Sequence, residues 1–86
     1  MESFKLHLLR LAREEKVEVP GVPVRSYTLV EKEEREDMAF YLVLEGELVI
    51  DLPQGQYLHL KRGEAARVTE PHRLVPVERV VLLEVG

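Results

Sequence analysis

Short runs of apolar and β-branched residues, interrupted by glycine and proline, constrain the fold of this chain more than any other feature. The runs cover residues 24–30, 40–44, 47–52, 57–60, 65–68 and 80–85, and the interruptions fall at Gly46, residues 53–55, Gly63 and Pro71. Leu48, Ile50 and Leu52 alternate with period two, so they share one face of a strand. The loop at 53–55 is short enough for a hairpin. Many short strands at close spacing predict an all-β barrel or sandwich.

The residues before these runs predict a short helical lead-in within residues 1–16. Apolar residues recur at helical spacing, at Phe4, Leu8, Leu11 and Ala12. Ser3 can cap the start, and no glycine or proline interrupts the segment up to Glu15. We expect an amphipathic helix over 4–15, although Leu6 and its apolar neighbours also alternate as they would in a strand. The two prolines and one glycine of 17–23 then predict a turn or an edge strand.

Residues 31–37 form an unbroken run of charged side chains, Glu-Lys-Glu-Glu-Arg-Glu-Asp. Their mixed signs favour self-neutralising surface pairs, so we expect a solvated connection between strands. Carboxylates from this run beside a histidine are the less favoured alternative, a site for a hard cation.

Composition bounds the class of protein. With 86 residues, 45% hydrophobic and 33% charged, the chain predicts a single globular domain spanning 1–86. It has no cysteine, which excludes disulfides, thiolate zinc sites and cysteine nucleophiles. A net charge of −4 without a basic stripe predicts no nucleic-acid partner. The sequence has no bilayer-length apolar stretch and no signal-peptide pattern, so we expect no membrane association and a cytoplasmic location. The lack of asparagine and the heavy use of Glu, Arg, Leu and Val predict a thermophilic source.

Four fragments together resemble a small single-domain member of the cupin superfamily. They are Tyr-Leu-Val-Leu-Glu-Gly-Glu-Leu at 41–48, Leu-Lys-Arg-Gly-Glu at 60–64, Pro-His-Arg at 71–73 and Val-Leu-Leu-Glu-Val at 81–85. The resemblance covers 38–86. It implies a double-stranded β-helix, or jelly roll, with the short N-terminal helix as its lead-in. Gly46 and Gly63 fall where strands bend or turn, so they support the fold rather than a reaction.

The same resemblance implies that the family's metal-binding motif is degenerate here. Metal-dependent cupins use a His-x-His pair and a glutamate on the first motif and one histidine on the second. The glutamate position falls on Ala39, there is no histidine between His7 and His59, and only His72 matches a ligand position. Because a lone imidazole holds a catalytic metal poorly, we predict no metal cofactor, with a divalent metal as the disfavoured alternative.

His72 and Tyr41 are the two candidate ligand-binding residues. In the cupin register, Tyr41 follows Ala39 by two residues on the same face and shares the barrel interior with His72. The competing interpretation makes His72 a barrel-mouth histidine that hydrogen-bonds a neighbouring carbonyl, and core packing is the alternative for Tyr41 and for Tyr27. His7 and His59 are expected at the surface or an interface. We predict no catalytic residues, since neither serine has a nucleophile-elbow context and there is no glycine-rich phosphate loop.

Three functions remain open. The leading hypothesis is a non-catalytic or catalytically degenerate cupin-like domain that binds a small organic ligand in the barrel mouth. The first alternative is a metal-dependent isomerase or oxygenase that uses His72 with carboxylates of 31–37. The second is a structural or protein-interaction barrel whose interior is filled by Phe40, Leu42 and Leu44. Open sheet edges and a small core also predict a homodimer, with the N-terminal segment packed across a sheet or exchanged with a neighbour.

Overall fold

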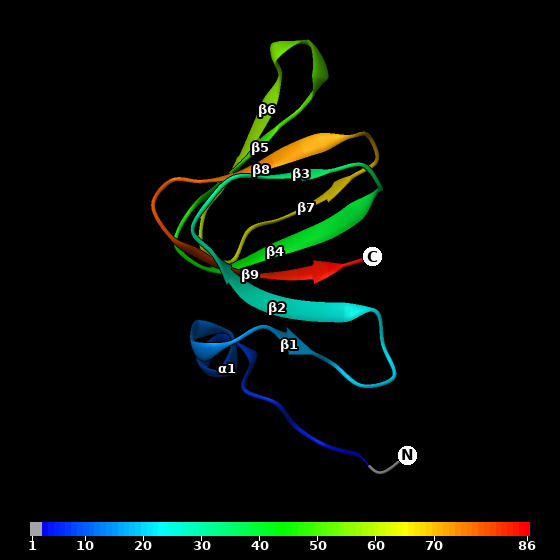
Figure 1. Ribbon diagram of the computed structural model, residues 1–86, viewed down its shortest axis with the longest axis vertical. Helices are drawn as coiled ribbons and strands as arrows, with labels where there is room; N and C mark the ends of the chain where they lie inside the picture. The colour runs from blue at the N-terminus through cyan, green and yellow to red at the C-terminus, as the bar shows by residue number, and fades with distance from the viewer. Residues whose placement is uncertain (1–2) are drawn as a thin grey trace.

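The computed structural model describes residues 3–86 as two facing antiparallel sheets with one short helix (Figure 1). Sheet A has the order β1-β2-β9-β4-β7, formed by Val17–Glu18, Val24–Leu29, Val80–Val85, Ala39–Glu45 and Ala65–Val68. Sheet B has the order β3-β8-β5-β6, formed by Glu33–Arg35, His72–Pro76, Leu48–Asp51 and Tyr57–Leu60. The expected all-β barrel with a helical lead-in is therefore confirmed. The β5–β6 hairpin rises beyond the rest of the barrel, and its loop at Pro53–Gly55 is where the sequence predicts a turn.

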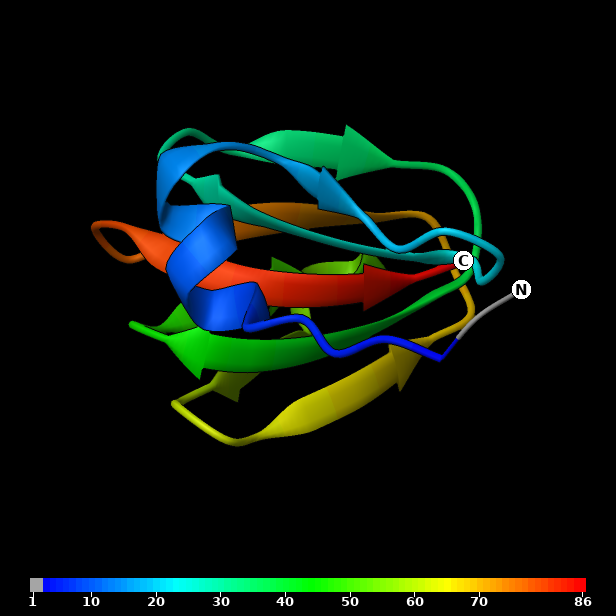
Figure 2. The same cartoon turned by 90° about the horizontal axis from the view of Figure 1, so that it is seen from below.

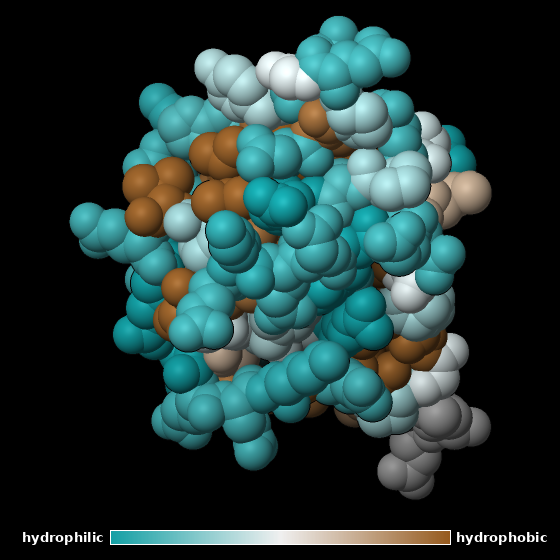
Figure 3. All heavy atoms as spheres, turned by 45° about the horizontal axis from the view of Figure 1, so that its top comes forward, coloured by the Kyte–Doolittle hydropathy of each residue, from teal (hydrophilic) through white to brown (hydrophobic). Residues whose placement is uncertain are grey.

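The core lies between the sheets because alternate residues of each strand point inward. On the face shown in Figure 3, hydrophilic residues predominate and hydrophobic ones form separate patches, since most large apolar side chains are inside. The buried cluster consists of Tyr27, Leu29, Ala39, Tyr41, Val43, Leu48, Ile50, Leu60, Val68, Leu74, Val80 and Leu82.

The side chains of β4 that point into the barrel are not those that one sequence alternative predicts. The filled-barrel alternative placed Phe40, Leu42 and Leu44 inside, and this is wrong. Tyr41 and Val43 are fully buried, whereas Phe40 is 38% exposed on the outer side of the sheet. Side-chain direction alternates at every residue, so the register that turns one set of residues inward turns the other set outward.

Helix α1 (Leu8–Glu14) begins four residues later than the periodicity predicts. His7, not Ser3, caps it: the His7 Nδ1 accepts a hydrogen bond from the backbone N–H of Arg10 at 3.2 Å. An imidazole acceptor at this position satisfies one of the free N–H groups that begin a helix. Residues 3–6 are exposed and non-helical. The helix covers the part of the outer face of sheet A formed by β2 and β9 and leaves the part around Phe40 open (Figure 2). Ala12 of the helix is buried, and its carbonyl accepts from Thr28 Oγ1 at 2.8 Å.

Two strands were not expected. Strand β3 lies inside the charged run and pairs with β8, so the expectation that 31–37 is only a connection between strands is wrong. The expected exposure and surface pairing are confirmed, since every residue of the run but Arg35 is exposed and Glu33 and Glu34 form ion pairs with arginines. An edge strand needs only one paired side, and its exposed positions tolerate the charges of this run. The sequence does not indicate strand β8, because this five-residue strand follows Pro71, ends at Pro76 and contains an arginine, so it has no apolar run of strand length. Pro76 is the last residue of that strand, where no further ladder hydrogen bond is needed from its nitrogen.

One glycine is needed for close approach as well as conformation. Gly46 joins β4 to β5 with φ +85°, and a Cβ placed on it would collide with the carbonyl oxygen of Arg79. Within residues 3–86, no helix is long and apolar enough to span a bilayer.

Candidate functional site

Polar and charged side chains gather inside one end of the barrel, which we call the mouth. It is the end at which β2, β4 and β8 begin and β3 and β9 finish, on the side of the label C in Figure 1. Strand register explains the gathering, because Glu84 is paired with both Tyr41 and Arg25, and Arg35 is paired with His72. Paired residues of neighbouring strands lie on the same face of the sheet. The mouth cluster consists of Arg25, Tyr27, Arg35, Tyr41, His72 and Glu84.

Glu84 is the centre of the charged part of this cluster. Its side chain is 2% exposed. A carboxylate this deeply buried needs positively charged partners and hydrogen-bond donors. Oε2 accepts from Arg25 Nη2 at 2.7 Å and from Arg35 Nε at 3.3 Å. Oε1 accepts from the Tyr27 hydroxyl at 2.6 Å, which in turn accepts from Arg35 Nη2 at 3.0 Å. Burial alone would raise the pKa of Glu84, but the hydrogen bonds from Arg25, Tyr27 and Arg35 outweigh it and hold this pKa below its ordinary value.

Tyr41 and His72 form the second part of the cluster. The Tyr41 hydroxyl lies 2.6 Å from His72 Nε2, with the rings edge-to-face, and the two side chains are 0% and 4% exposed. His72 Nδ1 lies 2.7 Å from the carbonyl oxygen of Glu70, so Nδ1 donates. In the neutral ring Nε2 is then the acceptor, and the tyrosine hydroxyl donates to it. Burial, with the nearby Glu84 charge, raises the pKa of Tyr41 to about 12.

The two sequence candidates are thus in direct contact, and the carbonyl bond that the competing interpretation of His72 requires is also present. Sequence reasoning missed Arg25, Arg35 and Glu84. A signal was available for Glu84, a single acid in the otherwise apolar strand 80–85. Arg35 had none, because its contact with Glu84 spans 49 residues of sequence and begins in a run of surface charges.

The other two histidines lie at the surface, as expected. His7 caps α1, and His59 lies 3.0 Å from Glu47 with 41% of its side chain exposed.

Of the surface hollows that border the cluster, two have Glu84 or His72 in their lining. One, of about 300 Å³, is lined by Arg25, Arg35 and Glu84 together with Met38 and Ala39. The other, of about 260 Å³, is lined by His72 and by residues of the loops around Pro53 and Pro71. Together the hollows bring solvent to the charged part of the cluster on one side and to His72 on the other.

The donor set of the mouth does not fit a divalent metal of the kind cupin enzymes hold. His72 is the single imidazole there, and both oxygens of Glu84 are committed to two guanidinium groups and a tyrosine hydroxyl. Among residues 3–86, no group of three His, Cys, Asp or Glu side chains could hold a metal ion. A catalytic site of this type needs about three protein ligands and an open position. Within the charged run, Glu33 and Glu34 are already paired with Arg35 and Arg73.

Comparison with solved structures identifies the fold. A Neisseria meningitidis protein has a TM-score of 0.76 at 18% identity, covering 99% of this chain and 98% of that one. A cupin superfamily protein from Desulfitobacterium hafniense has a TM-score of 0.72 at 18% identity, covering 100% and 92%. The cupin-2 domain of an XRE family transcriptional regulator from Enterobacter cloacae has a TM-score of 0.61 at 18% identity, covering 71% and 75%.

The chain has the cupin fold. No family model matches it, and no curated protein does so either. The jelly roll that the sequence resemblance implies is confirmed, and the cupin barrel carries the mouth cluster where the resemblance places His72. Because cupin barrels are a scaffold that hosts many functions, the function must be argued from the mouth itself.

Proposed function

We propose that this cupin barrel binds a small organic ligand at its mouth without a metal ion, and that it is not an enzyme. The observation that carries the proposal is the mouth cluster itself, in which a carboxylate, two guanidinium groups, two tyrosines and a histidine converge beside surface hollows. Ligand sites characteristically combine apolar walls with a few converging polar groups.

Stability alone is a weak reason for such a cluster. Replacing a buried ion pair with well-packed apolar residues is often neutral or stabilising. The opposite end of the same barrel shows that this chain can build an apolar interior, with Leu29, Val43 and Val80 buried there. The polar residues are instead concentrated at the end beside the hollows.

In this proposal His72 and Tyr41 form the inner wall of the site. His72 borders the second hollow, and Tyr41 lies behind it with no exposed surface. A ligand group that reaches the imidazole meets a ring whose tautomer is held by the Glu70 carbonyl. Tyr41 acts on the ligand through His72, whereas Arg25 and Arg35 border the first hollow and contact the ligand themselves.

A structural or interaction barrel is the second candidate. The observation favouring it is the complete burial of Tyr41 and near-complete burial of His72, whose polar atoms satisfy one another. In that case the cluster joins the sheets, because Arg35 and His72 of sheet B bond to Glu84 and Tyr41 of sheet A.

Two-dimensional ¹H–¹⁵N NMR separates the two candidates. A panel of small carboxylates, amines, amides, sugars and aromatic alcohols is titrated into labelled protein. The proposed function predicts that at least one class gives saturable shifts confined to amides near Arg25, Ala39, His72 and Glu84, and that Glu84→Gln abolishes them. The matched control is Glu64→Gln, which changes an acid in the exposed turn before β7. A panel that moves no mouth resonance contradicts the proposal and supports the structural barrel.

A further inference from the structure

The outer face of sheet A is apolar at the end that carries the mouth. The register of β2, β9, β4 and β7 places two rows of side chains there, on the face opposite the mouth cluster. The first row is Val24, Val85, Phe40 and Arg67, and the second is Ser26, Leu83, Leu42 and Ala65. Arg67, on the edge strand β7, is the single charged residue of the two rows. A sheet with one solvated face normally alternates apolar and polar residues, so these rows have the composition of a covered face.

Helix α1 covers only the other end of this face. Its main contacts are with β1, β2 and β9, and Val81 beside it is 1% exposed. In the first row, by contrast, Phe40 is 38% exposed, and its neighbours in both rows are partly exposed. We call the apolar residues of the two rows the open face, which consists of Val24, Phe40, Leu42, Ala65, Leu83 and Val85.

A second apolar surface of the same chain lies on the same side of sheet A. Residues 3–6 belong to no helix or strand, and no backbone hydrogen bond joins them to the rest of residues 3–86. Phe4 and Leu6 alternate along this segment and are 51% and 38% exposed. The segment runs from α1 toward the mouth end of the barrel, on the outer side of sheet A (Figures 1 and 2). The chain therefore carries both an uncovered apolar face and an apolar segment that its own fold does not bury.

We propose that the open face is the interface of a homodimer, in which residues 3–6 of each copy lie on the open face of the other. Because both surfaces are on one side of the chain, a two-fold axis brings each segment to the partner's face, and the two contacts form together. Composition favours a second copy over a different protein, since homodimer interfaces are more apolar than those of transient complexes. The inference does not rest on the proposed function, because the open face and the mouth cluster are on opposite sides of sheet A.

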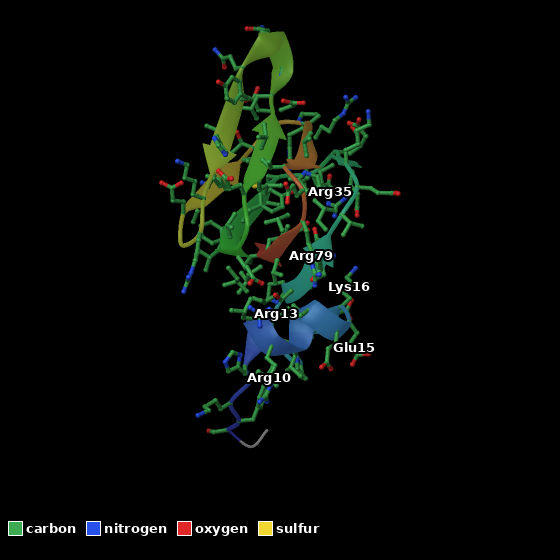
Figure 4. All side chains as sticks on the ribbon, turned by 90° about the vertical axis from the view of Figure 1, so that its left-hand side faces the viewer. Arg10, Arg13, Glu15, Lys16, Arg35 and Arg79 are labelled. Carbon is green, nitrogen blue, oxygen red and sulfur yellow. The ribbon has the colours of Figure 1, made fainter. Side chains whose placement is uncertain are left out.

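The size of the open face shows why the segment is needed. Four strands about 4.8 Å apart, with about four residues of 3.3 Å each, cover roughly 19 by 13 Å, or about 250 Å² in projection. A stable interface buries about 800 Å² on each partner. The exposed residues of α1 are charged ones, Arg10, Arg13 and Glu14, so the helix adds little apolar area (Figure 4). We therefore expect dimerisation to depend on Phe4 and Leu6 as well as on Phe40.

Sedimentation equilibrium of the full chain and its variants tests the residues. Phe4→Ser and Phe40→Ser are each expected to raise the dissociation constant of the dimer by roughly tenfold or more, as the loss of a buried aromatic anchor does. Tyr57→Ser is the matched control and should leave this constant unchanged, because Tyr57 is 65% exposed on the β5–β6 hairpin at the opposite end of the molecule (Figure 1). Phe4 lies outside every helix and strand, so its replacement tests the interface without disturbing the core.

A spin label distinguishes this dimer from one that uses another surface. The chain has no cysteine, so Ser3→Cys provides a single attachment site. Spin-labelled copies without ¹⁵N are mixed with ¹⁵N-labelled copies that carry no spin label, so that broadened amide signals report only on contacts between copies. We expect broadening at the amides of Phe40, Leu42, Leu83 and Val85, and none at Tyr57–Leu60.

Three results overturn the inference. They are a chain that stays monomeric at millimolar concentration, a dimer whose dissociation constant is unchanged by either Phe4→Ser or Phe40→Ser, and a dimer in which the label broadens a surface other than the open face. None of these outcomes bears on ligand binding at the mouth, which the titration of the labelled protein measures separately.

Discussion

Replacing Tyr41 with phenylalanine tests how much the buried Tyr41–His72 pair contributes to stability. The change removes one oxygen and leaves the ring in place. His72 Nδ1 is held as a donor by the Glu70 carbonyl, so in the neutral imidazole Nε2 stays an acceptor. Nε2 then becomes a buried acceptor without a partner in a side chain that is 4% exposed.

The expected loss follows from that geometry. Leaving a buried acceptor unsatisfied costs about 1–3 kcal/mol. The free energy of unfolding of a small domain is only about 5–15 kcal/mol, so this is a large fraction of it. For a domain of this length, we expect Tm to fall by roughly 4–24 °C.

Urea unfolding followed by far-ultraviolet circular dichroism measures the change. Tyr57→Phe is the control, because Tyr57 is 65% exposed and its ring is retained in the same way; we expect a change within about 0.5 kcal/mol. A double-mutant cycle with His72→Phe should show a coupling free energy of about 1 kcal/mol or more. If Tyr41→Phe is as stable as Tyr57→Phe, the hydrogen bond does not contribute and the reasoning is refuted.

Three further predictions concern other parts of the barrel. The pKa of Glu84 is lowered in the folded state, so ionised Glu84 stabilises the fold above its ordinary pKa of 4.5, and this stabilisation is lost as pH falls through the folded value. The free energy of unfolding, measured against pH, should therefore decrease over this acid range. A Glu84→Gln variant with the same dependence on pH would contradict this prediction. Gly46→Ala should lower the free energy of unfolding by at least about 1 kcal/mol, through the positive φ of this residue and the collision of the new Cβ with Arg79. Gly55→Ala is the control, because no atom lies within 4 Å of its new Cβ and only the conformational cost remains. Equal losses of stability for the two variants in chemical unfolding would disprove the collision. We also expect a homodimer that buries the outer face of sheet A, so Phe40→Glu should give a monomer by multi-angle light scattering, and an unchanged dimer would exclude that face.

The parts of the fold that sequence reasoning recovered are those in which local chemistry decides the structure. Tyr57–Leu60, Ala65–Val68 and Val80–Val85 have the predicted bounds, because each is an apolar run closed by a turn residue or a charge. The start of the helix and strand β3 were missed because both depend on contacts that the local pattern of apolar residues does not show. His7 becomes a cap only when the preceding residues leave the helix, and β3 becomes a strand only when β8 lies beside it.

The mouth was only partly predictable for the same reason. His72 and Tyr41 could be found because the cupin resemblance supplies a register that brings positions 31 residues apart together. The same register makes no prediction about Glu84 or the two arginines that bind it. Their pairing is a property of the folded barrel, in which β2 and β9 lie side by side and β3 faces them from the other sheet. The thermophilic source remains a prediction from composition.

Metal content measured by elemental analysis tests the central claim most directly. Protein purified without an affinity tag is analysed as isolated and after incubation with iron, manganese, zinc and nickel, beside a His72→Ala control. We expect no stoichiometric metal in any of these samples. The single histidine of the mouth bonds Tyr41, and its single buried carboxylate is held by two arginines. Near-stoichiometric metal that disappears in His72→Ala would contradict the account of the mouth as a metal-free ligand site.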